Sequence, residues 1–296
     1  MISKTDKDFF HKNRYLIKKN FFKENDLKLL TKCSLDVEKK ALEGKWKYIK
    51  IYREYPKFKY LNVFGVEFPF NKKINKDIFN EFSKLNYKDF FCELVGWDDF
   101  KSTLLRLHTN SNFFKYQGEW HRDGLDYPST DKFQLVIYLK DEKGFRIVPK
   151  CKNQLLKDYG IPSAERPNID QAFLKLNKNV YDEIEANRGD LLIFQSSLLH
   201  QGYAKDTRLH YHIRHEKIEK QIKNPENPYN FVEKFLPDYD LTNEYYNPRY
   251  FQKNLLSILT RIKTLFFYFM PRIKEILYNL THRKNKKTIT HSTIWQ

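Results

Sequence analysis

Trp120-His121-Arg122-Asp123-Gly124, which is followed far downstream by His200, is the stretch that decides the fold. Alternate residues of a β-strand point to the same side, so His121 and Asp123 can face one way while Arg122 faces the other. A second strand placed alongside would add His200. Two imidazoles and one carboxylate on one face suit a divalent iron and leave coordination positions open. The pattern therefore predicts a metal site shared by two neighbouring strands.

The surroundings make this short motif informative, because an isolated His-x-Asp triplet is common on solvated surfaces. A strongly apolar strand is expected at 133–139, directly after the triplet. Gly189-Asp190 opens a further predicted strand, 190–194, which leads to His200, and Arg208 opens the next one at 208–214. The triplet thus lies among strands, as a site built on a sheet requires.

Outward from this centre, the chain divides into a mixed N-terminal part and a strand-rich middle. A short strand is expected at 15–22, followed by a helix that Asn25-Asp26 would cap and a second helix at 74–85. From about residue 91 short strands alternate with turn residues, at 104–108, 133–139, 145–148, 190–194 and 208–214, with an irregular helical insertion at 151–177. Many short strands of this kind predict a mainly β domain, an antiparallel sandwich or barrel.

The order of these motifs is similar to that of a known family. It begins near Tyr15-Leu-Ile-Lys-Lys-Asn-Phe-Phe22 and continues through the 120–124 stretch, Ile137-Tyr-Leu-Lys-Asp141 and Gly144-Phe-Arg-Ile-Val-Pro149. It ends with Arg188-Gly-Asp-Leu-Leu-Ile-Phe194, His200-Gln-Gly202 and Arg208. Over roughly residues 14–216 the chain resembles the iron- and 2-oxoglutarate-dependent oxygenases of the phytanoyl-CoA dioxygenase type. One departure lies after Pro149, where the family often has a Gly-Ser-His turn and this chain has Lys150-Cys151-Lys152-Asn153.

The resemblance implies a double-stranded β-helix, a jelly-roll or cupin-like core, with flanking N-terminal helices and a C-terminal helical extension. It also implies that His121, Asp123 and His200 bind Fe(II) and that O2 and 2-oxoglutarate are co-substrates. Arg208 would grip the distal carboxylate of 2-oxoglutarate, because a guanidinium can bind a carboxylate in a bidentate fork.

Several other residues are candidates for the co-substrate pocket, each of them equally interpretable as an ordinary polar residue of a strand. Gln134, Thr109, Asn112 and Arg106 are weaker candidates than Arg208. Arg214 is a rival for the role of Arg208, since it lies six positions along the same strand, but it is expected to be too far from the metal end. His210, His212 and His215 are expected to be packing or surface residues and not ligands.

The activity implied is that of a dioxygenase that hydroxylates a C–H bond, because related halogenases lack the carboxylate that Asp123 supplies. The substrate is expected to be a small molecule or a lipid- or nucleotide-linked compound, and its identity and the oligomeric state are open. The alternative is a non-catalytic jelly-roll binding protein that a basic C-terminal tail attaches to an anionic membrane or to nucleic acid.

Charge is concentrated near the C-terminus. The chain of 296 residues has 54 basic and 37 acidic residues, a net charge of +17. Residues 251–296 carry nine Lys or Arg residues against Glu275 alone, and therefore +8 of that excess. Such a tail predicts an anionic partner. Signatures of a zinc finger, an RNA-recognition motif or a helix-turn-helix are absent from the sequence, so a nucleic-acid partner is disfavoured.

The apolar positions of 251–280 recur with helical spacing beside these cations, and a basic cluster follows at 283–287. Residues 251–287 could lie in the plane of an anionic bilayer. The alternative is a pair of helices that packs on the jelly roll or on a second subunit.

Four segments are therefore expected: 1–90, a strand and helices packed on the core; 91–216, the catalytic core; 217–250, an irregular wrap or linker; and 251–296, basic amphipathic helices and a tail. Cys33, Cys92 and Cys151 are widely spaced and read as reduced thiols. Since the first residues show no apolar signal core, a cytoplasmic protein is expected, with peripheral membrane attachment as a further expectation.

Overall fold

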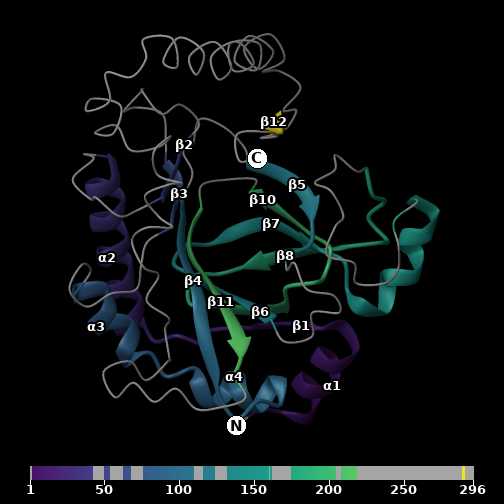
Figure 1. The fold of residues 1–296 in the computed structure, drawn as a ribbon, viewed down its shortest axis with the longest axis horizontal. Helices are drawn as coiled ribbons and strands as arrows, with labels where there is room; N and C mark the ends of the chain where they lie inside the picture. The colour runs from purple at the N-terminus through teal and green to yellow at the C-terminus, as the bar shows by residue number, and fades with distance from the viewer. Residues whose placement is uncertain are drawn as a thin grey trace.

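The computed structural model describes residues 2–42, 50–53, 63–67, 76–109, 116–123, 132–159, 161, 175–204, 208–218 and 289–290. Two largely antiparallel sheets form its centre (Figure 1). The larger sheet has the strand order β1-β9-β6-β11-β4-β3-β2, and the smaller has the order β12-β5-β10-β7-β8. The mainly β architecture predicted from the sequence is confirmed.

The strands of the larger sheet come from the N-terminal segment as well as from the core. They are β1 (Tyr15–Lys18), β2 (Lys50–Arg53), β3 (Val63–Glu67), β4 (Phe100–Thr109), β6 (Lys132–Tyr138), β9 (Leu191–Gln195) and β11 (Leu209–Lys217). The smaller sheet contains β5 (Tyr116–His121), β7 (Glu142–Ile147), β8 (Asp182–Ala186), β10 (His200–Ala204) and the short β12 (Ile289–Thr290). From β4 to β11 the chain passes repeatedly between the two sheets, so residues distant in sequence meet in the space that the sheets enclose.

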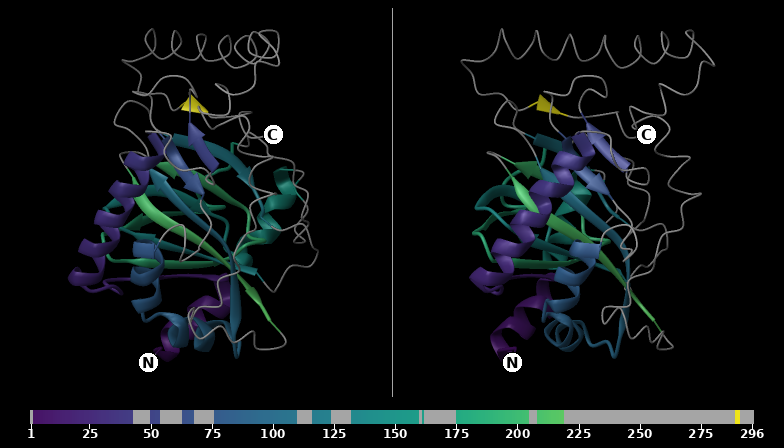
Figure 2. Two further views of the ribbon diagram at one scale, coloured as in Figure 1. Left: turned by 60° about the vertical axis from the view of Figure 1, so that its left-hand side comes forward. Right: turned by 90° about the vertical axis from the view of Figure 1, so that its left-hand side faces the viewer.

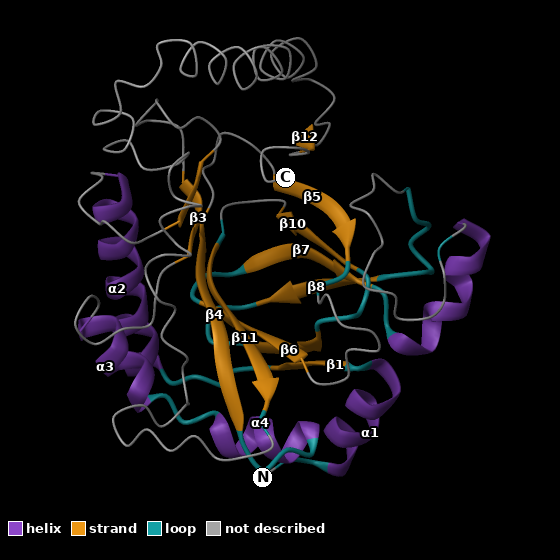
Figure 3. Ribbon diagram, viewed as in Figure 1, coloured by secondary structure: helices purple, strands orange, loops and turns teal. Residues whose placement is uncertain are grey.

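Helices cover the outer face of the larger sheet (Figures 2 and 3). They are α1 (Lys4–Asn13), α2 (Glu24–Leu42), α3 (Lys76–Lys84) and α4 (Lys88–Val95), and a 3-10 helix, η1 (Lys150–Tyr159), follows β7. Their fully buried side chains pack with the outward-facing residues of β4 and β11 in one apolar core that includes Leu30, Phe82, Phe91, Leu107, Tyr211 and Ile213. None of the described helices combines the length and the apolarity needed to cross a bilayer.

β11 shows how alternation separates this core from the interior. Tyr211, Ile213 and His215 are fully buried on the helix side of the sheet. His210 and His212 project to the other side, where their rings approach Tyr138 at 5.6 Å and Phe194 at 6.1 Å. Strand side chains alternate in this way because the backbone is pleated. The strand therefore presents imidazoles and Arg214 to the space between the sheets.

Most strands expected from the sequence are present with shifted ends. The strand expected at 104–108 is the centre of β4, those at 133–139, 190–194 and 208–214 are β6, β9 and β11, and 145–148 is the second half of β7. The insertion at 151–177 begins with η1. Helical structure continues to Val95 through α4, because Phe91 and Leu94 lie one turn apart and are both buried in the core. The expected linker at 217–250 and the helices at 251–280 lie outside the described residues, apart from the first two positions of the linker.

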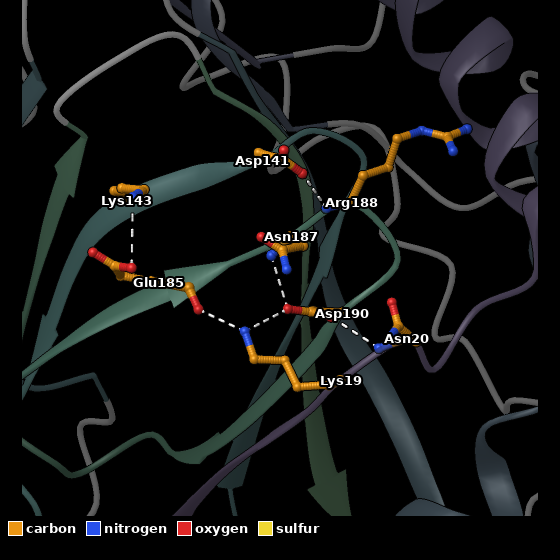
Figure 4. A network of polar contacts seen from close by, with 8 residues as sticks. All are labelled: Lys19, Asn20, Asp141, Lys143, Glu185, Asn187, Arg188 and Asp190. Atoms are coloured by element: carbon orange, nitrogen blue, oxygen red, sulfur yellow. Dashed lines mark hydrogen bonds and ion pairs between the residues drawn. The ribbon is translucent and has the colours of Figure 1, made fainter.

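Asp190 ties the N-terminal segment to the turn that precedes β9 (Figure 4). Its buried carboxylate accepts hydrogen bonds from Lys19 Nζ at 2.8 Å, from the backbone N–H of Asn20 at 2.9 Å and from that of Asn187 at 2.8 Å. Gly189 has a φ of +95°, which L side chains rarely adopt, so a glycine is required before the aspartate. The Gly-Asp pair thus fixes where β9 begins, and β9 leads to the metal-ligand candidates.

Candidate metal centre

The three candidate ligands come from the ends of two paired strands. His121 is the last residue of β5 and His200 is the first of β10, and the two are direct partners in the antiparallel register. Their ring centroids lie 4.3 Å apart. Asp123 follows two residues after His121, and its backbone N–H donates to the carbonyl oxygen of Ser196 at 2.9 Å. This bond holds the segment after β5 against the segment that joins β9 to β10.

The ligand atoms converge as a metal site requires. One potential ligand atom from each of His121, Asp123 and His200 lies within 4.8 Å of the others, and within the described part of the chain this is the one group that could hold a metal ion. Asp123 Oδ2 is 3.4 Å from His200 Nε2 and 3.9 Å from His121 Nε2. The pairing of β5 with β10 thus brings together the three side chains that the sequence spacing predicted to share one site.

The hydrogen bond of His200 orients its ring for coordination. His200 Nδ1 lies 2.8 Å from the carbonyl oxygen of Leu198. A carbonyl only accepts hydrogen bonds, so Nδ1 donates this bond and Nε2 is the ring nitrogen that faces Asp123 and His121. His200 is buried, with 2% of its surface exposed, so little solvent reaches that nitrogen. Leu198 contributes through its backbone, which the sequence pattern does not reveal.

Asp123 is held from both sides. Gln134 Nε2 donates to Asp123 Oδ2 at 2.6 Å, and an Arg214 guanidinium nitrogen lies 3.4 Å from Oδ1. Burial alone would raise the pKa of the Asp123 carboxyl, but Arg214, His200 and His121 outweigh that effect and hold the pKa well below its usual value. Asp123, a candidate ligand, is therefore anionic over the whole neutral range.

The position of Arg214 corrects the expectation that it lies too far from the metal end. β10 starts at the metal ligands and leads away from them, so β11, which follows it in the chain, returns and reaches the metal level only near its end. The register agrees, because Arg214 pairs with Gln134, and Gln134 itself contacts Asp123. The level of Arg214 thus follows from the direction of β11, which depends on how the strands pair.

The other candidates for the co-substrate pocket lie deeper between the sheets. Arg106 pairs with His212 in the register of β4 and β11, and Arg208, 5% exposed, immediately precedes β11. Thr109 ends β4 opposite Leu209, and its side chain lies outside the described residues, as does Asn112. Gln134 is the one of this group that the structure brings into contact with a candidate metal ligand.

The histidines of β11 occupy two environments. His215 accepts and donates hydrogen bonds in the helix-side core, with Nε2 3.1 Å from the Tyr87 hydroxyl and Nδ1 2.8 Å from that of Ser102. His210 lies between the sheets, where its Nδ1 is 2.8 Å from Glu142 Oε2. His215 is a packing residue, as the sequence suggested, whereas His210 and His212 lie in the interior beside the arginines.

The chain is similar in structure to several solved proteins. AviO1 from Streptomyces viridochromogenes Tue57 matches with a TM-score of 0.57 at 10% identity, covering 74% of this chain and 97% of its own. SnoK, a non-heme alpha-ketoglutarate-dependent carbocyclase from nogalamycin biosynthesis, gives a TM-score of 0.53 at 13% identity, with 73% and 84% covered. EctD from S. alaskensis, solved with 2-oxoglutarate and 5-hydroxyectoine, gives 0.55 at 14% identity, with 79% and 83% covered.

These likenesses establish a shared fold. No protein-family model matches the chain, and no curated protein matches it in sequence. The fold of this chain is thus the mainly β fold that SnoK and EctD also have.

Proposed function

We propose that the chain is an Fe(II)- and 2-oxoglutarate-dependent dioxygenase of the phytanoyl-CoA dioxygenase-like family. It hydroxylates a C–H bond of a small-molecule or a lipid- or nucleotide-linked substrate. The observation that carries this proposal is the convergence of ligand atoms from His121, Asp123 and His200 within 4.8 Å. The shared fold of two 2-oxoglutarate-dependent enzymes supports it.

The strand arrangement supports a double-stranded β-helix as the catalytic core. In order, β4, β6, β9 and β11 belong to the larger sheet and β5, β7, β8 and β10 to the smaller. Eight strands divided in this way between two sheets, four in each, form a jelly roll. The metal ligands then lie at one end of it, where β5 ends and β10 begins.

The donor set fits ferrous iron, since two neutral imidazole nitrogens and one carboxylate oxygen are the ligands of facial-triad oxygenases. When bound, iron with 2-oxoglutarate would supply the oxidising chemistry. His121, Asp123 and His200 would hold the metal on one face. Gln134 keeps one carboxylate oxygen of Asp123 in a fixed direction, because its amide donates to that atom.

The space between the two sheets contains cationic side chains that suit a dianion. Arg106 and Arg208 lie along it below the metal level, and the nearby carboxylate of Glu142 is engaged with His210. A buried cation is stabilised by an anionic partner, and a guanidinium binds carboxylate well. A metal-bound 2-oxoglutarate would place its distal carboxylate among these groups. Arg208 remains our first candidate for that contact, with Arg106 as its neighbour.

The test is spectroscopic and needs no substrate. Purified protein is loaded anaerobically with ferrous iron and then with 2-oxoglutarate, and the visible charge-transfer band of the chelate is recorded. We expect the band in the wild type, its loss in Asp123→Ala, and a higher 2-oxoglutarate concentration at half-saturation in Arg208→Ala. The partly exposed Arg188 provides the control, since Arg188→Ala should leave the band and its saturation unchanged.

A wild-type protein that binds iron and gives no band would overturn the proposal. A protein that binds no iron at all would favour the alternative, a non-catalytic jelly-roll binding protein that its basic C-terminal tail attaches to an anionic membrane or to nucleic acid.

We also propose that residues 251–287 attach a cytoplasmic protein to an anionic membrane surface. The specific support is the excess of nine cations over one acid in 251–296. Flotation with liposomes, with and without anionic lipid, compares the full chain with a form that ends at residue 250. We expect only the full chain to float, and only with anionic lipid. Equal flotation of both forms would contradict attachment through the tail.

A further inference from the structure

A column of basic and imidazole side chains runs along the interior face of two paired strands. On β11, His210, His212 and Arg214 alternate toward that face, and β4 places His108 opposite His210 and Arg106 opposite His212. An interior between two sheets is normally filled by apolar side chains. The departure from that rule requires a polar occupant or a network of internal partners.

His108 has no such network. It is 9% exposed, and within the described part of the chain neither of its ring nitrogens has a hydrogen-bond partner. Its ring lies 5.0 Å from that of His210 and 5.6 Å from that of His212, and β3 places only Gly65 opposite it. His210, in contrast, is bonded to Glu142. A buried polar group left unsatisfied costs about 1–3 kcal/mol, so a partner for His108 is expected from outside the protein.

The charges around His108 favour an anionic partner. Burial first, and then Arg208, His210, Arg106 and His212, hold the pKa of His108 well below its usual value. Tyr138 of β6 lies beside His210 of β11 in the same sheet, and Glu142 of β7, in the other sheet, is engaged with His210 through its carboxylate. The imidazole is therefore neutral in the ligand-free protein, because burial and the surrounding cations disfavour its protonated form. An anion bound beside the ring would favour its protonated form over its neutral form.

The length of this column along the strand matches that of an extended ligand. His210 precedes Arg214 by four residues, which is about 13 Å along a strand. Arg214 marks the metal level through its contact with Asp123. A five-carbon dicarboxylate could bind a metal through one end and a cationic side chain through the other. The ligand and the side chains that contact its two ends would together span such a length. Its free carboxylate would then lie near His108 and Arg208.

We infer, resting on the proposed function, that His108 takes up one proton from solvent when 2-oxoglutarate binds and that the imidazolium shares the distal carboxylate with Arg208. The proton moves to a ring nitrogen of His108, and no covalent bond of the ligand changes. The ligand is a dianion at neutral pH, and Arg106, Arg208 and Arg214 are always protonated, so none of them supplies or takes the proton. Affinity for 2-oxoglutarate consequently rises as the pH falls through the neutral range.

The experiment is isothermal titration calorimetry of 2-oxoglutarate into the anaerobic, iron-loaded full-length protein near neutral pH. Two buffers with low and high heats of ionisation are compared, because protons that the complex takes up come from the buffer. We expect the observed enthalpy to depend on the buffer, with up to one proton taken up per ligand. In His108→Gln binding should persist with an enthalpy that no longer depends on the buffer, and His108→Asn serves if the first variant does not fold.

The exposed His11 provides the matched control, since His11→Gln removes a histidine and should leave proton uptake unchanged. Binding by the wild type with an enthalpy that is the same in both buffers would overturn this inference and leave the proposed function intact. Uptake that persists in His108→Gln would overturn it as well, because another group would then accept the proton. A wild type that binds no 2-oxoglutarate would instead overturn the proposed function.

Discussion

Gln134 determines how Asp123 is presented to a metal. Its amide nitrogen donates to Asp123 Oδ2 at 2.6 Å, and its side chain is fully buried in the middle of β6, so this contact is fixed by the sheet. A hydrogen bond from outside the ligand set restricts the rotation of a carboxylate, and such contacts are worth about 10- to 100-fold in metal affinity. Gln134 is thus better described as a positioning residue than as the direct co-substrate contact that the sequence suggested.

Replacement of Gln134 by leucine, which has a similar volume, tests this role. We expect the affinity for Fe(II) to fall by about 10- to 100-fold in Gln134→Leu, because Asp123 loses its donor while the packing of β6 is kept. Anaerobic titration of the apoprotein with ferrous iron measures the affinity. Gln154→Leu, at an exposed position of η1, is the control and should bind iron as the wild type does. An unchanged affinity in Gln134→Leu would show that the strands alone position Asp123.

At the scale of elements, the turn before β9 holds the N-terminal segment to the core. The carboxylate of Asp190 accepts two backbone N–H groups and the Lys19 ammonium. Removal of a buried charged acceptor leaves its donors unsatisfied, and each such bond is worth about 1.5–3 kcal/mol. We expect Asp190→Ala to lower the free energy of unfolding by about 3 kcal/mol or more, measured by urea denaturation.

The control for this prediction is a residue between β6 and β7 that contacts the same turn. Asp141 accepts one hydrogen bond, from the backbone N–H of Arg188 at 2.8 Å, in an exposed position. Asp141→Ala should therefore cost about 1 kcal/mol or less, since water replaces an exposed acceptor. Equal losses in the two variants would mean that Asp190 contributes no more than a surface acceptor.

Elements and their faces were predictable from the sequence where local periodicity sets them. The apolar 133–139 pattern identifies β6, and the alternation of 208–214 identifies β11, because side-chain burial in a strand follows the pleat. Pairing partners and strand directions depend on contacts between distant segments, and local patterns carry no record of them. Arg214 illustrates the difference: its face was predicted, and its level along the strand was wrong. Gln134 was predicted to contact the co-substrate, and the contact that the structure shows is its hydrogen bond to Asp123.

At the scale of the whole molecule, the two sheets separate histidines with different surroundings. The ring of His215 lies in the apolar core between β11 and the helices, 4.0 Å from the ring of Phe100 and bonded to Tyr87 and Ser102. Burial holds the pKa of His215 well below its ordinary value of 6.5, against a smaller opposing contribution from the Arg214 backbone. His108, on the interior face, is also neutral because of burial and Arg208. Global stability therefore depends on keeping these imidazoles unprotonated.

The sign of the pH dependence follows from this difference between the folded and unfolded states. A histidine with a depressed pKa in the folded state binds its proton more readily when unfolded, so its contribution is fully present above about 6.5 and is lost as the pH falls below that value. Each such histidine adds a slope of about 1.4 kcal/mol per pH unit. We expect the free energy of unfolding, measured with urea in steps between about pH 8 and pH 5, to decrease steeply on the acid side.

His215→Phe should reduce that acid slope by the contribution of one proton-binding group. It should also lower the stability at neutral pH by about 1–3 kcal/mol, because the hydroxyls of Tyr87 and Ser102 lose their partner. His11→Gln, an exposed control, should leave the slope unchanged. A His215→Phe protein with the full acid slope would show that His215 binds its proton equally well in the folded and unfolded states.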